Sequence, residues 1–181
     1  RDSDRNGVVD PGSVGSPATA KNALAVGATE NDRLPGSGGY SAYTWGAAWP
    51  NNYPAAPIAG DYLSYSATLT PRYLQGMAAF SSRGPALDGR IKPDVVAPGT
   101  DVLSTRSAVG GPVWRAFDSN PRYCFGGGTS MSTPLIAGAA LLLRQYAAER
   151  AGITNPSAAL IRAMMAGGAR SLTPGQYGTT L

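Results

Sequence analysis

At residues 125–134 the chain reads Phe-Gly-Gly-Gly-Thr-Ser-Met-Ser-Thr-Pro, directly before an apolar stretch at residues 135–143. A run of glycines lets the backbone turn tightly and approach another molecule closely. The hydroxyl residues that follow are typical of a helix start, and Pro134 suits a first helical turn, where a missing N–H costs little. Ser130 is therefore expected at a helix N-terminus, a place that favours developing negative charge beside a nucleophile.

Two other interpretations fit this stretch locally. Glycines and hydroxyl residues before an apolar helix are most often only a helix cap after a turn. A loop that cradles phosphate is the second alternative, although the Lys of a Walker-type loop is absent from the glycine run. Neither interpretation accounts for the rest of the chain.

The motif at residues 128–134 resembles the nucleophile motif of the subtilisin-like serine proteases, the subtilases. The family more often has Ala at the position of Ser132. Other family-like stretches occur in the same order along the chain, at residues 14–18 with 25–28, 80–85 and 92–99. The resemblance implies a three-layer α/β fold with a mostly parallel sheet, of which this chain would hold the C-terminal part.

The resemblance also implies roles for individual residues. Ser130 would be the catalytic nucleophile, within a nucleophile loop of Gly128, Thr129 and Ser130 whose Ser130 N–H supplies one oxyanion donor. The pocket for the residue before the scissile bond would be formed by Gly15, Ser16 and Pro17. A glycine at its base leaves room for a large apolar or aromatic side chain, and an ordinary turn glycine is the alternative.

Length and composition favour one globular domain. The chain has 181 residues, of which 43% are apolar and 14% charged, so a soluble protein with one core and no membrane span is expected. The net charge of +4 is spread along the chain and does not indicate nucleic-acid binding. Cys124 is the only cysteine, so no disulfide can form within the chain. A small buried side chain is expected at this position.

The chain contains no histidine. A Ser–His–Asp mechanism needs an imidazole that takes the proton of the serine. The resemblance therefore implies that the Asp, the His and the oxyanion-hole Asn all precede residue 1. We interpret residues 1–181 as the C-terminal portion of a single subtilase catalytic domain, which pairs with the N-terminal half of that domain and is inactive alone.

Residues 2–10 follow the pattern of a calcium-binding loop. Oxygen-bearing side chains stand at alternate positions, Gly7 allows the sharp turn, and Val8 would offer its backbone oxygen. The twelfth position is Ser13 instead of a bidentate Glu, so the loop is not that of an EF-hand. A solvated acidic turn is the alternative to a structural Ca²⁺ site, whose predicted ligands are Asp2, Asp4, Asn6, Val8 and Asp10.

Two charged residues lie in the other family-like stretches. Asp94 resembles a ligand of the second, weaker cation site of the family, where the carbonyls of the 18–23 loop also gather. An ordinary turn carboxylate is the alternative for Asp94. Arg83 is expected to organise hydrogen bonds in a turn and to take no part in catalysis.

Residues 31–75 resemble the family least, and we interpret them as an insertion. The segment is rich in Gly, Pro, Tyr and Trp, and long segments of this kind are often functional. Its aromatic side chains would line an extended substrate groove or anchor the insertion to the body of the domain, and anchoring is favoured. Residues 68–73 are expected to form a short hairpin strand.

Hydrophobic patterning predicts the remaining elements. Short buried strands are expected at residues 22–29, 94–97 and 101–105. Residues 135–148 are apolar on nearly every side, which is typical of a central buried helix. A second helix is expected from an Asn155 cap, with Pro156 at its first position, to about residue 166. Ala159, Leu160, Ala163 and Met164 would form its buried side.

The sequence thus favours a serine endopeptidase that hydrolyses polypeptide substrates through a Ser130 acyl-enzyme. It has no expected nucleic-acid or membrane partner, and a secreted, extracellular location is implied by the family alone. A catalytically inactive subtilase-like scaffold, or a binding module that uses the aromatic insertion, is the alternative, which the missing histidine favours and the retained Ser130 disfavours.

Overall fold

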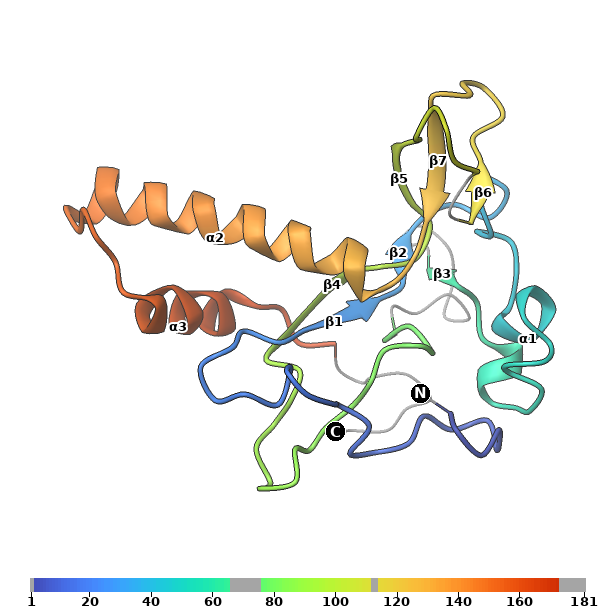
Figure 1. The fold of residues 1–181 in the computed structure, drawn as a ribbon, viewed down its shortest axis with the longest axis horizontal. Helices are drawn as coiled ribbons and strands as arrows, with labels where there is room; N and C mark the ends of the chain where they lie inside the picture. The colour runs from blue at the N-terminus through green and yellow to red at the C-terminus, as the bar shows by residue number, and fades with distance from the viewer. Residues whose placement is uncertain (1, 66–75, 112–113, 173–181) are drawn as a thin grey trace.

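The computed structural model describes residues 2–65, 76–111 and 114–172 (Figure 1). In chain order, its elements are β1 (Val26–Thr29), β2 (Asn31–Asp32), α1 (Trp45–Ala48), the short 3₁₀ helix η1 (Ile58–Gly60), β3 (Ser64–Tyr65), β4 (Val95–Pro98), β5 (Val102–Thr105), β6 (Arg115–Ala116), β7 (Tyr123–Gly126), α2 (Thr129–Ala151) and α3 (Ala158–Gly168). None of the helices in these ranges is long and apolar enough to cross a membrane.

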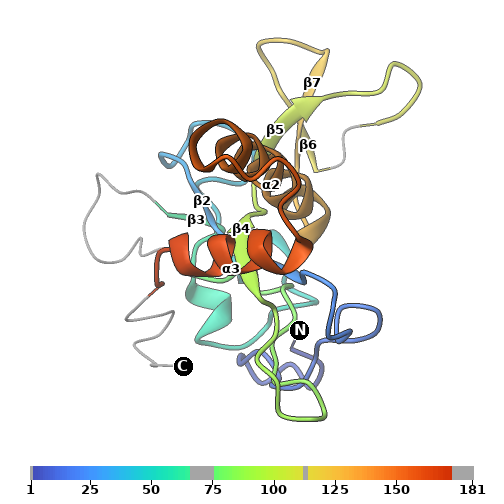
Figure 2. The ribbon, with the colours of Figure 1, turned by 90° about the vertical axis from the view of Figure 1, so that its left-hand side faces the viewer.

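Strands β1 and β4 form the parallel pair that organises the fold. They run in register from Val26 opposite Val95 to Thr29 opposite Pro98. Both long helices pack on this pair, and Ile161 of α3 is buried in the same cluster as Val95. Figure 2, which looks along α2, shows α3 crossing in front of β4. The α/β class is confirmed, whereas a three-layer arrangement around a larger parallel sheet stays a prediction.

Helix α2 begins at Thr129, so Ser130 lies at the helix N-terminus, where it was expected. Pro134 therefore lies inside the helix and not in its first turn, so position 134 cannot donate a helix hydrogen bond to the carbonyl of Ser130. The helix ends at Gly152, which takes the left-handed conformation with φ 68°, and Arg150 lies in its last turn.

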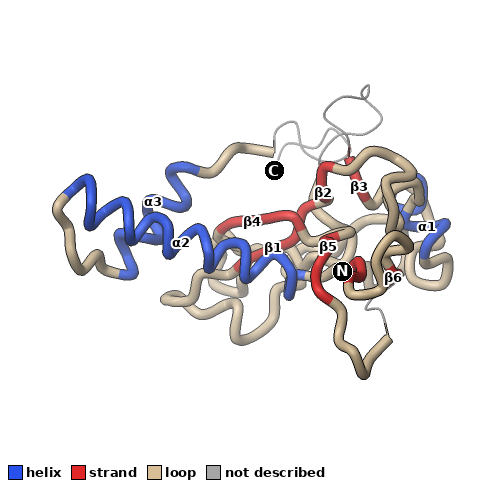
Figure 3. Tube along the Cα trace, turned by 90° about the horizontal axis from the view of Figure 1, so that it is seen from above, coloured by secondary structure: helices blue, strands red, loops and turns tan. Residues whose placement is uncertain are grey.

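The prediction that this helix is buried on every side is wrong for the described residues. Leu135 is 48% exposed, Leu141 and Leu142 are each 68% exposed, and Tyr146 is 58% exposed. The adjoining side of α2 packs on β1, β4 and α3. Figures 1 and 3 show its C-terminal half extending beyond the strands, with α3 beside it. An apolar helix needs cover on all sides, and the described residues cover one of them.

Helix α3 starts later than predicted because a different residue caps it. The hydroxyl of Ser157 accepts a hydrogen bond from the N–H of Leu160 at 3.2 Å, so Ser157 and not Asn155 is the N-cap. The buried side chains are Ile161 and Met165. The predicted apolar side was therefore misplaced: Ala159 and Ala163 are exposed, although Leu160 and Met164 are half-buried.

The described part of the insertion, residues 31–65, shares a hydrophobic core with the body of the domain. Trp45 is fully buried, and its ring centroid lies 5.7 Å from that of Trp49, 5.3 Å from that of Tyr53 and 5.6 Å from that of Phe80. The same cluster includes Ala28 at the end of β1. The structure thus supports the anchoring interpretation for these aromatic residues. The strand predicted at residues 68–73 lies outside the described residues.

Strands β5, β7 and β6 form a small antiparallel sheet in which β7 is central. In Figure 1 this sheet stands above the start of α2. Cys124 of β7 is buried and free, in line with the small buried side chain expected there. Because β7 ends at Gly126 and α2 begins at Thr129, the central strand of this sheet leads directly into the loop before Ser130.

Candidate active site

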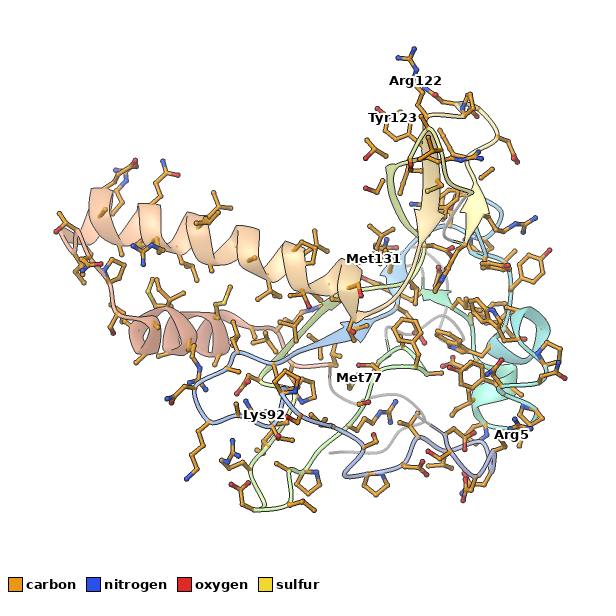
Figure 4. All side chains as sticks on the ribbon, viewed as in Figure 1. Arg5, Met77, Lys92, Arg122, Tyr123 and Met131 are labelled. Carbon is orange, nitrogen blue, oxygen red and sulfur yellow. The ribbon has the colours of Figure 1, made fainter. Side chains whose placement is uncertain are left out.

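Ser130 lies in the first turn of α2 and its side chain is exposed. The first N–H groups of a helix have no carbonyl partner within the helix. Within the described ranges, neither the hydroxyl nor the N–H of Ser130 has a hydrogen-bond partner. The next residue, Met131, marks this helix start in Figure 4. An exposed hydroxyl and a backbone N–H donor thus lie together at the positive end of a helix, an arrangement that suits a nucleophile beside a developing oxyanion.

The turn before Ser130 depends on Gly128 and Gly99. Gly128 has φ +137°, a conformation that favours glycine, and its N–H donates to the carbonyl of Gly99 at 2.7 Å. A Cβ on Gly99 would meet Ser132 Oγ at 2.5 Å and Ala28 Cβ at 2.6 Å. The end of β4 therefore touches the nucleophile loop so closely that it has no room for a side chain.

Ser132 fixes the first turn of α2 to the end of β4. Its side chain is fully buried, and its hydroxyl lies 2.9 Å from the carbonyl oxygen of Ala97 and 3.2 Å from that of Pro98. On the exposed side of the same turn, the hydroxyl of Thr133 donates to the carbonyl of Thr129 at 2.8 Å. These contacts hold the backbone on either side of Ser130, and sequence reasoning missed both of them.

The predicted pocket residues Gly15, Ser16 and Pro17 lie on an exposed loop that leads towards β1. The Ser16–Pro17 peptide bond is cis. A Cβ on Gly15 would meet nothing within 4 Å, so the space beside this glycine is open. Among the described residues, no hydrogen bond joins this loop to Ser130, and a shared pocket stays a prediction.

A general base for Ser130 is missing from the described part of the chain. The sequence has no histidine, and no described side chain forms a hydrogen bond with the Ser130 hydroxyl. The described residues therefore supply a nucleophile and an oxyanion donor but no proton acceptor for the nucleophile. Chemically, the site as it stands can receive an acyl group only if a base from elsewhere takes the serine proton.

The acidic loop at residues 2–10 has the oxygen donors that calcium prefers. Its carboxylates also accept backbone hydrogen bonds: Asp2 from the N–H groups of Asn6 at 3.1 Å and Gly7 at 3.0 Å, and Asp10 from that of Ser3 at 2.8 Å. The bonds from Ser3 lower the pKa of Asp10. The donor chemistry fits calcium, although no three His, Cys, Asp or Glu side chains in the described ranges gather as a metal-binding group. The calcium site stays a prediction.

Asp94, the other predicted cation ligand, faces two cationic side chains. Its carboxylate lies 2.7 Å from Lys92 Nζ and 3.5 Å from an Arg162 Nη2, and it accepts the N–H of Ala25 at 2.7 Å. Burial alone would raise the pKa of Asp94, but these partners outweigh it and hold the pKa below its ordinary value. Arg83 is joined to Ser13 through its backbone, by an N–H donated to the Ser13 hydroxyl at 3.0 Å and a carbonyl that accepts the Ser13 N–H at 2.8 Å.

Two fully buried carboxyl groups were not predicted as structural residues. Asp101 accepts hydrogen bonds from the Tyr40 N–H at 2.8 Å and the Ser64 hydroxyl at 3.1 Å, which join the insertion to the chain after β4. Glu30 accepts one from the Gly76 N–H at 2.9 Å. Burial raises the pKa of Asp101, and burial together with the nearby Asp61 raises the pKa of Glu30 well above its ordinary value. The only sequence feature that pointed to the burial of Glu30 was its position directly after an apolar strand.

Comparison with known proteins agrees with the motifs. A family model described as the subtilase family matches residues 3–178. Pyrolysin of Pyrococcus furiosus is 35% identical over 166 residues, which is 91% of this chain and 10% of pyrolysin. The serine protease/ABC transporter B family protein tagB of Dictyostelium discoideum is 36% identical over 124 residues, 60% of this chain and 6% of that protein. Serine protease AprX of Bacillus subtilis is 43% identical over 72 residues, 38% of this chain and 16% of AprX.

Among solved structures, the CspB protease of Clostridium perfringens has a similar fold. Its TM-score is 0.51 at 23% sequence identity, and the match covers 92% of this chain and 25% of that one. At this identity the likeness concerns the fold alone. The chain therefore spans only a small part of the length of the proteins that it resembles.

Proposed function

The chain belongs to the subtilase family, and on that premise we propose that it carries the nucleophile of a serine endopeptidase that acts on polypeptide substrates. The family is one of serine peptidases, and the curated relatives named above include serine proteases. The single observation that carries the assignment to Ser130 is its position in the exposed first turn of α2, where neither its hydroxyl nor its N–H has a hydrogen-bond partner among the described residues.

The reaction follows from this position. Ser130 Oγ attacks the carbonyl carbon of the scissile peptide bond while a general base takes the hydroxyl proton. The oxyanion that forms is stabilised by the Ser130 N–H and by the positive end of α2. The base then gives its proton to the leaving amine, and an ester links the acyl group to Ser130. Water, deprotonated by the same base, hydrolyses the ester and restores the serine.

The remaining parts of the site are proposed to come from the N-terminal half of the same catalytic domain. That half would supply the His as general base, the Asp that orients it and an Asn as second oxyanion donor. Two observations support this partner. Parallel strands normally lie buried within a larger sheet, whereas in the described part of the chain β1 and β4 form a sheet of two strands, extended by an isolated antiparallel bridge between Thr29 and Met77. Helix α2 also exposes Leu135, Leu142 and Tyr146 along one side.

An open cavity lies on the same part of the molecule. It has a volume of about 1120 Å³ and is bordered by β4, α2 and α3, with Val96, Leu142 and Met164 among its lining residues. A mostly apolar space of this size beside a parallel strand is unfavourable in water. We therefore propose that the N-terminal half packs against α2 and brings the general base, without which residues 1–181 would have no peptidase activity.

Peptidase kinetics test the assignment of Ser130. In the full-length protein, Ser130→Ala is expected to lower kcat/KM for a chromogenic peptide by at least about 1,000-fold, because the covalent route is lost. The matched control is Ser119→Ala, which removes another exposed hydroxyl and should leave kcat/KM unchanged. Equal activity of both variants would contradict the proposal.

An inactive subtilase-like scaffold, or a binding module, is the competing function. The aromatic residues of the insertion offer little support for a binding surface, because Trp45 is fully buried and packs on Trp49 and Tyr53. The missing histidine is the observation that favours an inactive scaffold. Full-length protein that hydrolyses no peptide and whose Ser130 resists acylation would favour that alternative.

We also propose that the loop at residues 2–10 binds a structural Ca²⁺, with Asp2, Asp4, Asn6 and Asp10 providing side-chain oxygens and Val8 a carbonyl. Calcium that binds only the folded protein stabilises it, so it should raise the thermal midpoint of wild type more than that of Asp4→Ala. Equal shifts would contradict the site. A secreted location is a proposal from the family alone, tested by comparing the protein in the culture medium and in the cells.

A further inference from the structure

Cationic side chains surround Asp94 where the loop at residues 19–25 meets the start of β4 and helix α3. We call this site, which includes Lys92 and Arg162, the Asp94 corner. Lys92 is 4% exposed, and its Nζ donates to the Asp94 carboxylate at 2.7 Å and to the carbonyl of Ala23 at 3.0 Å. Arg162, which comes from α3, reaches the other oxygen of Asp94 at 3.5 Å. Figure 4 shows Lys92 below the start of β1, where the loop approaches the strand.

The carbonyls of this loop receive hydrogen bonds from cationic side chains at alternate positions. Arg90 donates to the carbonyl of Thr19 at 2.7 Å, and Arg162 donates to that of Lys21 at 3.0 Å. Lys92 donates to that of Ala23, as described above. A metal ion bound at Asp94 would need oxygen ligands of this kind. Here the carboxylate and these three carbonyls are already directed at N–H donors.

The charges around Asp94 also disfavour a metal ion there. The Lys92 side chain is 2% exposed, so water screens its ammonium weakly. A divalent ion on Asp94 would lie beside this buried positive charge, and a single carboxylate would have to balance both. The residues present therefore do not fit a metal ion at this position.

We propose that Lys92 is the built-in cation of this corner and takes the place of a metal ion, with Arg162 completing the coordination of Asp94 and the loop carbonyls. The arrangement joins the loop before β1, the start of β4 and helix α3 without any dissolved ion. It does not depend on the proposed peptidase activity. Its consequence is that this corner is insensitive to chelators but depends on Lys92.

The experiment measures thermal midpoints of the full-length protein in the Asp4→Ala background, which removes the loop at residues 2–10 as a source of calcium response. The buffer contains an organic cation and either chelator, calcium or sodium. The Asp4→Ala protein and the Asp4→Ala/Asp94→Asn protein should show equal shifts of the thermal midpoint when calcium or sodium is added. A metal shift that Asp94→Asn abolishes would overturn the proposal.

Lys92→Met, added to the same background, should lower the midpoint in chelator by several degrees, because the half-buried charge of Asp94 loses its nearest cationic partner. Calcium or sodium should then recover part of that loss, since the vacated position offers oxygen ligands. The matched control is Lys21→Met, which removes an exposed positive charge from the same loop and should cause neither effect. A Lys92→Met variant as stable as its parent in chelator would overturn the proposal.

If Lys92→Met does not fold, equilibrium dialysis with radioactive calcium tests the proposal instead. It compares two proteins that both retain Lys92. Asp4→Ala and Asp4→Ala/Asp94→Asn should bind the same number of calcium ions. One calcium ion fewer in the Asp94→Asn protein would show a metal at Asp94 and contradict the proposal.

Discussion

At the scale of single residues, the candidate site combines one exposed serine with buried groups that hold its surroundings. Ser130 is exposed, whereas Ser132, two residues later, is fully buried and bonded to the end of β4. Two similar hydroxyls in one short motif thus differ in exposure, because the helix turns them to different sides of α2. The position of Ser130 at a helix N-terminus could be predicted from the sequence because the motif is distinctive, but the contacts of Ser132 could not, because its carbonyl partners lie on a distant segment.

The buried Glu30 gives the protein a pH-dependent stability. Its pKa is raised well above the ordinary 4.5 by burial, so the folded protein keeps the proton to a higher pH than the unfolded chain does. The free energy of unfolding should therefore fall as the pH rises from 4.5 through the folded-state pKa, by about 1.4 kcal/mol for each pH unit that separates the two pKa values. Below pH 4.5 both states hold the proton and the loss is absent.

Urea unfolding across this pH range checks the effect. Glu30→Gln cannot ionise, so its stability relative to wild type should increase as the pH rises. Glu149→Gln, which removes an exposed carboxylate from α2, is the control and should follow wild type. A wild-type profile that runs parallel to that of Glu30→Gln would show that Glu30 is ionised in the folded protein at no cost.

At the scale of elements, the junction of β4 and α2 is the feature that positions the site. Strand β4 was predicted to within about one residue, since an apolar β-branched run bounded by Pro residues is a strong signal. The start of α2 at Ser130 was expected, but Pro134 lies beyond the first turn predicted for it, because the contacts of Gly128 and Ser132 with the end of β4 hold the helix start at Thr129. The cap of α3 was misassigned because Ser157 and Asn155 are both good caps and only the geometry distinguishes them.

The close approach at Gly99 yields a prediction for this junction. Gly99→Ala should lower the free energy of unfolding by about 1–3 kcal/mol, because the added methyl group collides with Ser132 Oγ and Ala28 Cβ. The same variant should slow acylation of Ser130 by a fluorophosphonate, since the first turn of α2 has to move. Urea unfolding and labelling rates of the full-length protein measure the two effects.

Gly60→Ala is the matched control for that experiment, because a Cβ on Gly60 would meet nothing within 4 Å. It should change stability by less than about 0.5 kcal/mol and leave the labelling rate unchanged. If Gly99→Ala behaved like Gly60→Ala, the contact between β4 and the nucleophile loop would not be as close as the structure has it.

At the scale of the whole molecule, the described residues form an α/β unit whose longest helix is covered on one side. The fold class and the family could be predicted from the order of the motifs. The uncovered side of α2 could not, because an all-round apolar sequence shows that cover is needed but not which residues provide it. The aromatic residues of the insertion agree with the anchoring that the sequence favoured, since Trp45 packs in one core with residues of the domain body.

The proposed cover on α2 can be tested by charge substitution. In the full-length protein, Leu142→Glu should lower the free energy of unfolding by about 2–5 kcal/mol, because the N-terminal half would bury the new carboxylate and lose the apolar contact. Leu87→Glu is the control: Leu87 is fully exposed on a loop, and its substitution should cost less than about 0.5 kcal/mol. Equal costs for the two variants would show that nothing packs on this side of α2.

The most direct test of the central claim is to locate a fluorophosphonate adduct in the full-length protein by peptide mass spectrometry. The account predicts one adduct, on the peptide that contains Ser130, and its loss in Ser130→Ala, because the unpaired hydroxyl at the start of α2 is the activated nucleophile. An adduct that persists in Ser130→Ala, or full-length protein that forms none, would contradict the account.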